Sequence, residues 1–561
     1  MTVKRHAEGK PRKSRTAPSV YPVSKTEAVP GPKPGILTPI MRDTVLRVSV
    51  VLLVATLAGC ARPRLDPTPD LRVTADLVQA DALVRQGCYR CLQDAIALYD
   101  KAAATGRAPM AAGRAVDAAY LLAMRERELG LGRGTARARA DELAQALPPP
   151  SDYAMVQAIA DVLPWNQSGV SREQQDALLW TYQTTNQNWA AWRATLIARA
   201  PGDLLSAYLL ISLDCHYDYK LREDTVDRWR PAGDGVPPLL RYRQAACGQV
   251  IGDVPLEAVL KAVPRFGEVH LFLGQLAFAR GTLGTAERHY LAALEAIPDL
   301  VVAQHGLGHV YFLMEDLESA RDAFHRANHA VPGLREAMLG EAKSLSYLGR
   351  SDEALAILDE MERLGTWFLG EMHYWRAWNR HRLRQFDVAD REVLAARTYL
   401  PMDPQVDKLA GMVALALSDV PRAEREFRLA VQHFEGRNAR DCDAGYYLAS
   451  TLVIQKKWTE AGPIFEKAEP CYVQDEGALR RRIEEIRVSA LPDERKVRLI
   501  AAKERDIVTV RLQQGRAAFN AAAAYANLGD VAKARPLAER AAAHPDLKNL
   551  VAPLLARLAG K

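Results

Sequence analysis

A spacing of 34 residues constrains the fold of this 561-residue chain more than any other feature. Gly274 is followed by Gly308, and Pro298 by Pro332, in each case 34 residues later. Two matches at one spacing indicate an internal repeat, and a repeat of this length is typical of helix pairs that pack on their neighbours. The glycines predict close approach of paired helices, and the prolines predict where the second helix ends. We therefore expect an all-α solenoid of antiparallel helix pairs.

The residues between these markers resemble the tetratricopeptide repeat (TPR). The first unit contains Leu273-Gly274, Ala286, Tyr290, Ala293 and Pro298, and the second contains Leu307-Gly308, Tyr311, Ala320, Phe324, Ala327 and Pro332. The resemblance implies two helices per unit, wound into a right-handed superhelix, with Tyr290, Tyr311 and Phe324 filling the space between helices. Weaker matches continue on both sides, and no alternating pattern typical of strands recurs.

Residues 41–60 have the features of a bacterial export signal. Arg42 and Arg47 supply positive charge, and residues 48–57 supply an apolar run that is too short to span a membrane. The segment ends in Leu57-Ala58-Gly59-Cys60, which resembles the lipobox of bacterial lipoproteins. That resemblance implies cleavage before Cys60 and acylation of its thiol and new amino group. The alternative is an uncleaved apolar helix with an incidental cysteine.

The residues around this signal refine the prediction. Residues 1–40 contain seven prolines and a charge of +6, so we expect disorder, and translation could instead begin at Met41. Ala61 follows the lipobox where an Asp would retain a lipoprotein in the inner membrane, so the resemblance implies the outer membrane, facing the periplasm. From Cys60 onward the formal charge is −1, which argues against nucleic-acid binding.

These observations divide the chain into eight predicted segments. They are a disordered basic extension (1–40), a lipoprotein signal peptide with its lipobox (41–60), a proline-rich tether (61–72), an N-terminal TPR-like unit (73–106), degenerate helical repeats (107–265), the TPR array (266–473), a charged helical excursion (474–510) and a C-terminal TPR unit with a capping helix (511–561). For the charged segment we expect a solvated face in preference to a binding patch.

Six cysteines follow Cys60, and an even number in an exported protein predicts disulfides. Cys442 and Cys471 lie at neighbouring ends of one predicted helix pair, so a bridge between them is sterically reasonable. Cys215 and Cys247 have a similar spacing. Cys88 and Cys91 lie in a predicted turn, where we favour a local disulfide over free thiols or a metal or redox pair.

No motif for catalysis, phosphate binding or a cofactor is evident, so we expect a protein that is not an enzyme and holds no cofactor. His305 and His309 are four residues apart on a predicted helix, as a metal pair would be. The sequence places no third ligand beside them, and we therefore predict no metal site.

In TPR proteins the first helix of each unit lines a concave groove, and the resemblance carries this role onto named residues here. The predicted groove residues are His305, His309, Phe312, Leu313, Lys343, Ser346, Tyr347, Tyr374, Trp378, His381 and Arg382. A surface that is aromatic and basic suits an extended peptide or a helix with acidic groups. Any one of these aromatic side chains could instead pack between repeats.

The sequence therefore predicts a lipid-anchored, non-catalytic scaffold or adaptor that binds other proteins of the cell envelope. The alternative is a glycan-binding lipoprotein of an outer-membrane uptake system, resembling SusD. Five tryptophans in the non-periodic region would then provide sugar-stacking surfaces: Trp165, Trp180, Trp189, Trp192 and Trp229. The regular repeats at 267–334 are unlike that family's pattern.

Overall fold

The computed structural model describes residues 71–106, 108–131, 134–147, 153–162, 190–217, 235–247, 254–489 and 491–560. The predictions for the extension, the signal peptide, Cys60 and all but the last two residues of the tether lie outside these ranges. Within them the regular elements are helices, with no strand, which confirms the all-α prediction. No helix of the described part is both long and apolar enough to cross a membrane.

The N-terminal part begins with a helix pair and continues with less regular helices. They are α1 (Leu71–Gln86), α2 (Tyr89–Ala104), α3 (Pro109–Glu128), α4 (Thr135–Gln145), α5 (Ala154–Val162), α7 (Leu204–Tyr217), α9 (Pro238–Cys247) and α10 (Val254–Ala262). The helices α1 to α4 pack on one another in sequence. Tyr99 and Leu92 of α2 and Tyr120 of α3 are fully or almost fully buried.

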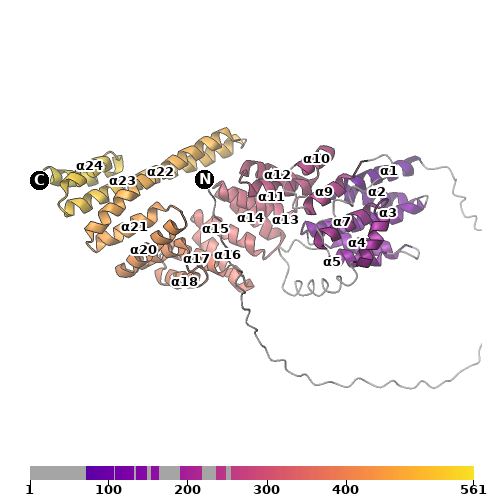
Figure 1. The fold of residues 1–561 in the computed structure, drawn as a ribbon, viewed down its shortest axis with the longest axis horizontal. Coiled ribbons are helices and arrows are strands. Elements are labelled where there is room, and N and C mark those ends of the chain that lie inside the picture. Colours follow the sequence, from indigo (N-terminus) through magenta and orange to yellow (C-terminus); the bar gives the residue numbers. More distant parts are fainter. Residues whose placement is uncertain are drawn as a thin grey trace, which may run out of the picture. The chain divides into compact units, whose positions relative to one another are not determined.

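The helices that follow form the repeat array, in which each helix packs on the next (Figure 1). They are α11 (Gly267–Ala279), α12 (Leu283–Ala296), α13 (Val301–Leu313), α14 (Leu317–Ala330), α15 (Arg335–Tyr347), α16 (Ser351–Leu364), α17 (Leu369–Arg382), α18 (Phe386–Tyr399), α19 (Pro404–Ala416), α20 (Val420–Gly436) and α21 (Cys442–Ile454). Pro298 and Pro332 lie just beyond α12 and α14, where the sequence predicts these helices to end.

The turn within each helix pair repeats one backbone conformation. In the helix pairs from α11 to α20, the second residue after the first helix is left-handed, at Gly281, Glu315, Gly349, Arg384 and Ser418, with φ between 59° and 80°. These positions are 34 or 35 residues apart, so the turns keep the period of the sequence. Glycine adopts this conformation without strain, whereas Glu315 and Arg384 adopt it at a cost.

In α12 and in α14, an aromatic side chain fills the space that two glycines leave open. A Cβ atom on Gly308 would lie 2.5 Å from Phe324, and one on Gly340 of the next unit 2.6 Å from the same ring. Tyr290 has the same relationship to Gly274 and Gly306. This confirms the predicted packing of small against large residues. It also links successive units, because each ring touches a helix of the unit that follows.

A buried charged cluster joins the N-terminal helices to the array. Arg125 of α3 and Glu268 of α11 have side chains that are 0% exposed, and their N and O atoms are 3.0 Å apart. Arg125 also pairs with Glu128, and its guanidinium lies 4.2 Å from the ring of Tyr242. Charged groups can be buried at this depth only when they are paired, so the cluster fixes how α3, α9 and α11 meet.

Two long helices follow the array and lie side by side (Figure 1). They are α22 (Trp458–Val488) and α23 (Asp493–Asn527), and we call the pair the hairpin. Its charged residues are not all solvated: the Arg495 side chain is largely buried and Lys503 is 4% exposed, each in ion pairs with the array. For these two residues the expectation of a solvated face is wrong. The chain ends with α24 (Val531–Ala542) and α25 (Lys548–Ala559).

Candidate functional site

Most of the predicted groove residues lie on three first helices, α13, α15 and α17, and remain at least partly accessible. Tyr347 is 52% exposed and Leu313 is also exposed. His309 and Arg382 are exposed, and the others are half-buried except for Ser346. Ser346 is buried and accepts a hydrogen bond from Asn379 Nδ2, 2.7 Å away. Its placement in the groove is therefore wrong.

Aromatic rings connect these helices across the surface. The centroid of Phe312 lies 5.8 Å from that of Tyr347, which lies 5.3 Å from that of Trp375. Trp375 in turn lies 6.3 Å from Trp378. Edge contacts of this kind are favourable. The sequence does not indicate Trp375, because this buried residue lies between the half-buried Tyr374 and Trp378 on α17. The i, i+4 pattern of accessible residues passes over it.

The groove is less basic than the sequence suggests. Lys343 forms an ion pair with Glu371 of α17, so its charge is already neutralised. His305 and His309 lie with their Nε2 atoms 3.2 Å apart. Burial lowers the pKa of His305, and burial together with the neighbouring His305 lowers the pKa of His309 to about 4. Burial also lowers the pKa of His381, so all three histidines are neutral at pH 7.

Two arginines remain as free positive charges at the end of α17. Arg382 and Arg384 are both exposed, and neither has an ion pair within the described residues. Arg384 was not predicted, because it follows the helix and occupies the left-handed turn position. The turn geometry places it beside the groove, and only the period of the turns could have indicated this.

A pocket of about 370 Å³ lies beside these arginines, between α17 and α19. Its lining residues are Trp378, His381, Arg382, Arg384, Phe386, Met412 and Ala416. The indole N–H of Trp378 is shielded from solvent and has no hydrogen-bond acceptor. A buried donor without an acceptor carries a free-energy cost. The pocket thus offers an apolar wall beside two free cations, which suits an apolar side chain next to an acidic group.

Trp378 also packs inside the array. It is half-buried and contacts two hydrophobic clusters, one around Val406 and Leu409 and the other around Met338 and Leu358. Tyr374 contacts both clusters as well, and burial raises its pKa. These two side chains therefore contribute both to inter-repeat packing and to the groove wall.

The described residues contain two disulfides. The structure joins Cys88 to Cys91 at the start of α2, and Cys442 to Cys471 between α21 and α22. The side chains of Cys215 and Cys247 lie outside the described part of the chain. The sulfur atoms of Cys442 and Cys471 and a carboxylate oxygen of Asp475 lie within 4.8 Å of one another. Because both sulfurs are in the disulfide, they are not available as thiolate ligands for a metal.

The other predicted alternatives can be located only in part. His305 and His309 are joined by no third histidine, cysteine or carboxylate in the described ranges that would complete a metal site. Of the five tryptophans considered for glycan binding, four lie outside those ranges. The fifth, Trp192, is half-buried against the N-terminal hydrophobic core, which leaves little of a stacking platform.

Comparison with known proteins gives structural matches alone. No family model matches the sequence, and no curated protein matches it. One similar structure is a tetratricopeptide repeat protein from Parabacteroides merdae, with 12% identity, a TM-score of 0.33, and coverage of 53% of this chain and 99% of that chain. Another is that of the APC/C hetero-tetramer Cut9–Hcn1, with 13% identity, a TM-score of 0.38, and coverage of 87% and 96%.

A third match is YrrB, described as a TPR protein with an unusual peptide-binding site. It has 18% identity, a TM-score of 0.28, and coverage of 32% of this chain and 93% of that chain. Scores and identities this low transfer no function. The fold assignment rests on the helix pairs, turns and glycine–aromatic contacts of the chain itself.

Proposed function

We propose that this protein is a non-catalytic scaffold whose array binds peptide segments of other proteins along α13, α15 and α17. The pocket beside Trp378 is the observation that carries the proposal. It sets the apolar surface of Trp378, Phe386 and Met412 beside the unpaired charges of Arg382 and Arg384. A peptide with an acidic side chain next to an apolar one would match both features.

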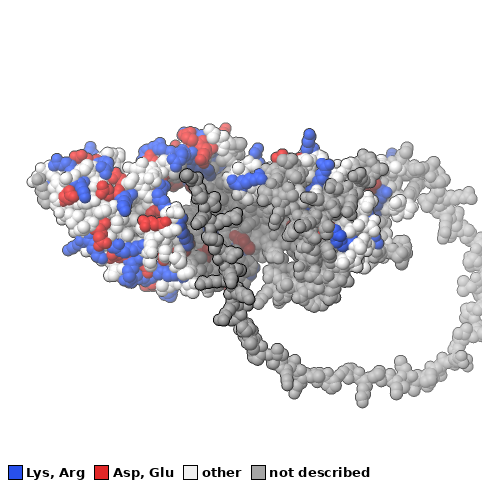
Figure 2. Space-filling model, viewed as in Figure 1, with Lys and Arg blue, Asp and Glu red and all other residues white. Residues whose placement is uncertain are grey.

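The surface on which this pocket lies has the composition of a protein-binding site. Tyr, Trp and Arg are enriched where binding energy is concentrated, and here Tyr347, Trp378 and Arg382 follow one another over two neighbouring units. On the face seen in Figure 2, positive and negative side chains are interspersed over the C-terminal helices. That distribution lacks the broad basic face that a phosphate backbone would require.

Selection from a random dodecamer peptide library displayed on phage tests the proposal. The full chain should enrich peptides that carry an acidic residue close to an aromatic or aliphatic one. Arg382→Glu/Arg384→Glu should lose these peptides, and Arg487→Glu, an exposed charge change on the hairpin, should retain them. Recovery of no consensus, or equal recovery by the Arg382→Glu/Arg384→Glu protein, would contradict the proposed function.

For its location, we infer that the chain is a lipoprotein of the cell envelope, anchored through acyl chains on Cys60 and facing the periplasm from the outer membrane. The support is the order of positive charge, apolar run and lipobox within residues 41–60. Two or more acyl chains give stable anchoring, whereas a single short chain gives reversible binding.

Intact-mass measurement of protein extracted from membranes tests this location. The expected mass corresponds to a chain that begins at Cys60 and carries acyl groups. Cys60→Ala should abolish both processing and membrane association. A mature N-terminus upstream of Cys60, or a Cys60→Ala protein that is still processed and membrane-bound, would contradict it.

A further inference from the structure

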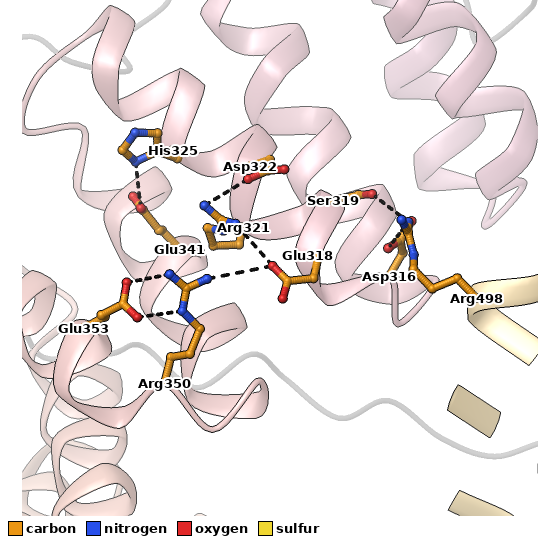
Figure 3. Close-up of polar contacts among 10 residues, drawn as sticks. All are labelled: Asp316, Glu318, Ser319, Arg321, Asp322, His325, Glu341, Arg350, Glu353 and Arg498. Atoms are coloured by element: carbon orange, nitrogen blue, oxygen red, sulfur yellow. Dashed lines mark hydrogen bonds and ion pairs between the residues drawn. The ribbon is translucent and has the colours of Figure 1, made fainter. Parts of the chain in front are cut away.

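The first turns of α23 rest on the array although about 180 residues of chain separate them. Arg495 Nε lies 2.6 Å from Asp316 Oδ2, and Arg495 also pairs with Glu287 of α12. Arg498 donates to Asp316 Oδ1 at 2.9 Å and to Ser319 Oγ at 3.3 Å (Figure 3). Two helical turns further along, Lys503 pairs with Glu315. Three cations of one helix thus meet three carboxylates of α12–α14.

Two of these carboxylates, those of Asp316 and Glu315, are directed at α23. Asp316 precedes α14 at its N-cap position but makes no capping hydrogen bond, and its side chain is 2% exposed. The aspartates at the same position of later units, Asp419 and Asp530, do cap their own helices. Glu315 occupies a left-handed turn position that is glycine in the flanking units. Both side chains therefore fit a role in holding α23.

Charge holds this contact more than apolar packing does. Leu499 is buried between the helices, yet it belongs to neither of the two large hydrophobic clusters among the described residues. Two cavities of about 760 Å³ each flank it, one on either side. Open space beside an interface means lost dispersion contacts, so this contact is less tightly packed than the core of the array.

One of these cavities brings α23 to the predicted groove. Its walls are Phe312, Tyr347 and Leu348 from the array and Leu499, Ala502 and Lys503 from α23, among others. Near Phe312 and Tyr347 the groove therefore has a second wall, formed by α23. The ion pairs of α23 with α12–α14 hold this wall in place.

We propose that the hairpin is a strap, and that its ionic contacts with α12–α14 control access to Phe312 and Tyr347. With the contacts formed, α23 covers one side of this part of the groove. With the contacts broken, Phe312, Tyr347 and the carboxylates of Glu287 and Asp316 become more exposed to solvent. The role of the strap in ligand access rests on the proposed function. That the ion pairs hold the strap against α12–α14 does not rest on it.

Hydrogen exchange of the full chain, without ligand, tests whether the ion pairs hold the strap. In Arg495→Glu/Arg498→Glu, exchange in residues 483–500 and 311–319 should accelerate by roughly tenfold or more, since like charges then face Glu287 and Asp316. Exchange in α17–α20 should be unchanged. Arg487→Glu is the matched control, because within the described part of the chain Arg487 pairs only with Glu484 of the same helix. Reversing Glu287 and Asp316 to Lys in the double variant should restore protection.

Hydroxyl-radical labelling of the same proteins tests access to the groove. Labelling of Tyr347 in the double variant should rise, by less than about twofold because half of its side chain is already exposed, while labelling of Tyr399, which is also 52% exposed but lies on α18, should not change. Unchanged exchange, or exchange that accelerates throughout α17–α20 as well, would overturn the strap. Faster exchange without greater labelling of Tyr347 would overturn its control of access. None of these outcomes depends on whether peptides bind.

Discussion

Gly308 and Phe324 are in such close contact that a Cβ atom on the glycine would lie 2.5 Å from the ring. Phe324 is 1% exposed and is held from its other side by Gly340, so it has no room to move. Gly308→Ala should therefore destabilise the protein by about 1–3 kcal/mol through overpacking, although alanine is the better helix former by about 1 kcal/mol. Chemical denaturation followed by circular dichroism measures the difference.

Gly445 provides the control for this change. It lies inside α21, and a Cβ atom there would meet its nearest neighbour at 3.9 Å, an ordinary contact. Gly445→Ala should stabilise the protein by up to about 1 kcal/mol. Equal effects of the two substitutions would show that helix propensity, and not the contact with Phe324, decides the result.

Trp378→Ala should affect binding and stability together, because Trp378 both packs between units and lines the pocket. We expect a loss of about 2 kcal/mol of unfolding free energy, below the 3–5 kcal/mol of a fully buried tryptophan, and a loss of about 2 kcal/mol in peptide affinity. Thermal melting and a titration with a selected peptide measure the two effects. A loss near the fully buried value would identify Trp378 as a core residue and remove it from the site.

Arg382→Ala separates the two roles. Its side chain is exposed and has no ion pair in the described structure, so stability should change by less than about 0.5 kcal/mol. Peptide affinity should nevertheless fall. If affinity is unchanged, the acidic group of the ligand is not held at this end of α17.

The disulfide between Cys442 and Cys471 joins residues 29 positions apart. Removing it by Cys442→Ser/Cys471→Ser should cost about 3–4 kcal/mol, because the unfolded chain regains the freedom of a long loop. The pair at Cys88 and Cys91 closes a loop of only three positions and should contribute about 2 kcal/mol. Non-reducing peptide mapping should find both bridges, and alkylated free thiols at these positions would refute them.

The pH dependence of stability should report the close contact between His305 and His309. The pKa of His309 is about 4 in the folded chain, whereas the unfolded chain takes up a proton at this position near pH 6.5. The unfolded state thus binds more protons between these values, and stability falls as the pH falls from about 6.5 to about 4. His309→Gln should remove on the order of 1 kcal/mol of that loss, a value reduced by the exposure of the ring. Identical pH profiles for the two proteins would contradict this.

The regular part of the fold follows from the sequence because it is encoded locally. Gly274, Gly308, Pro298 and Pro332 mark close contacts and helix ends within a unit, and the structure places them in those roles. The ion pairs that join α23 to α12–α14 could not be anticipated in this way. Asp316 and Arg495 are 179 positions apart and share no period.

The candidate site was likewise predictable only where it depends on local pattern. Periodicity along one helix places Tyr374, Trp378 and Arg382 on one face, but it does not indicate what faces them. The pairing of Lys343 with Glu371 comes from a neighbouring unit. His305 and His309 crowd each other within α13. Those contacts change a surface predicted to be basic into one with two free charges.

The ion pairs between α23 and the array also bear on how the protein unfolds. In a simple repeat protein each unit contacts only its neighbours, so the stability of the whole is a sum of local terms and the ends fray independently. A contact that joins α12–α14 to α23 adds a term between distant units. The units enclosed by it lose that freedom, because none of them can unfold without either breaking the contact or leaving a loop closed at both ends. The segment from α12 to α23 should therefore melt as one cooperative block, with a folding nucleus that includes a loop closure of high contact order.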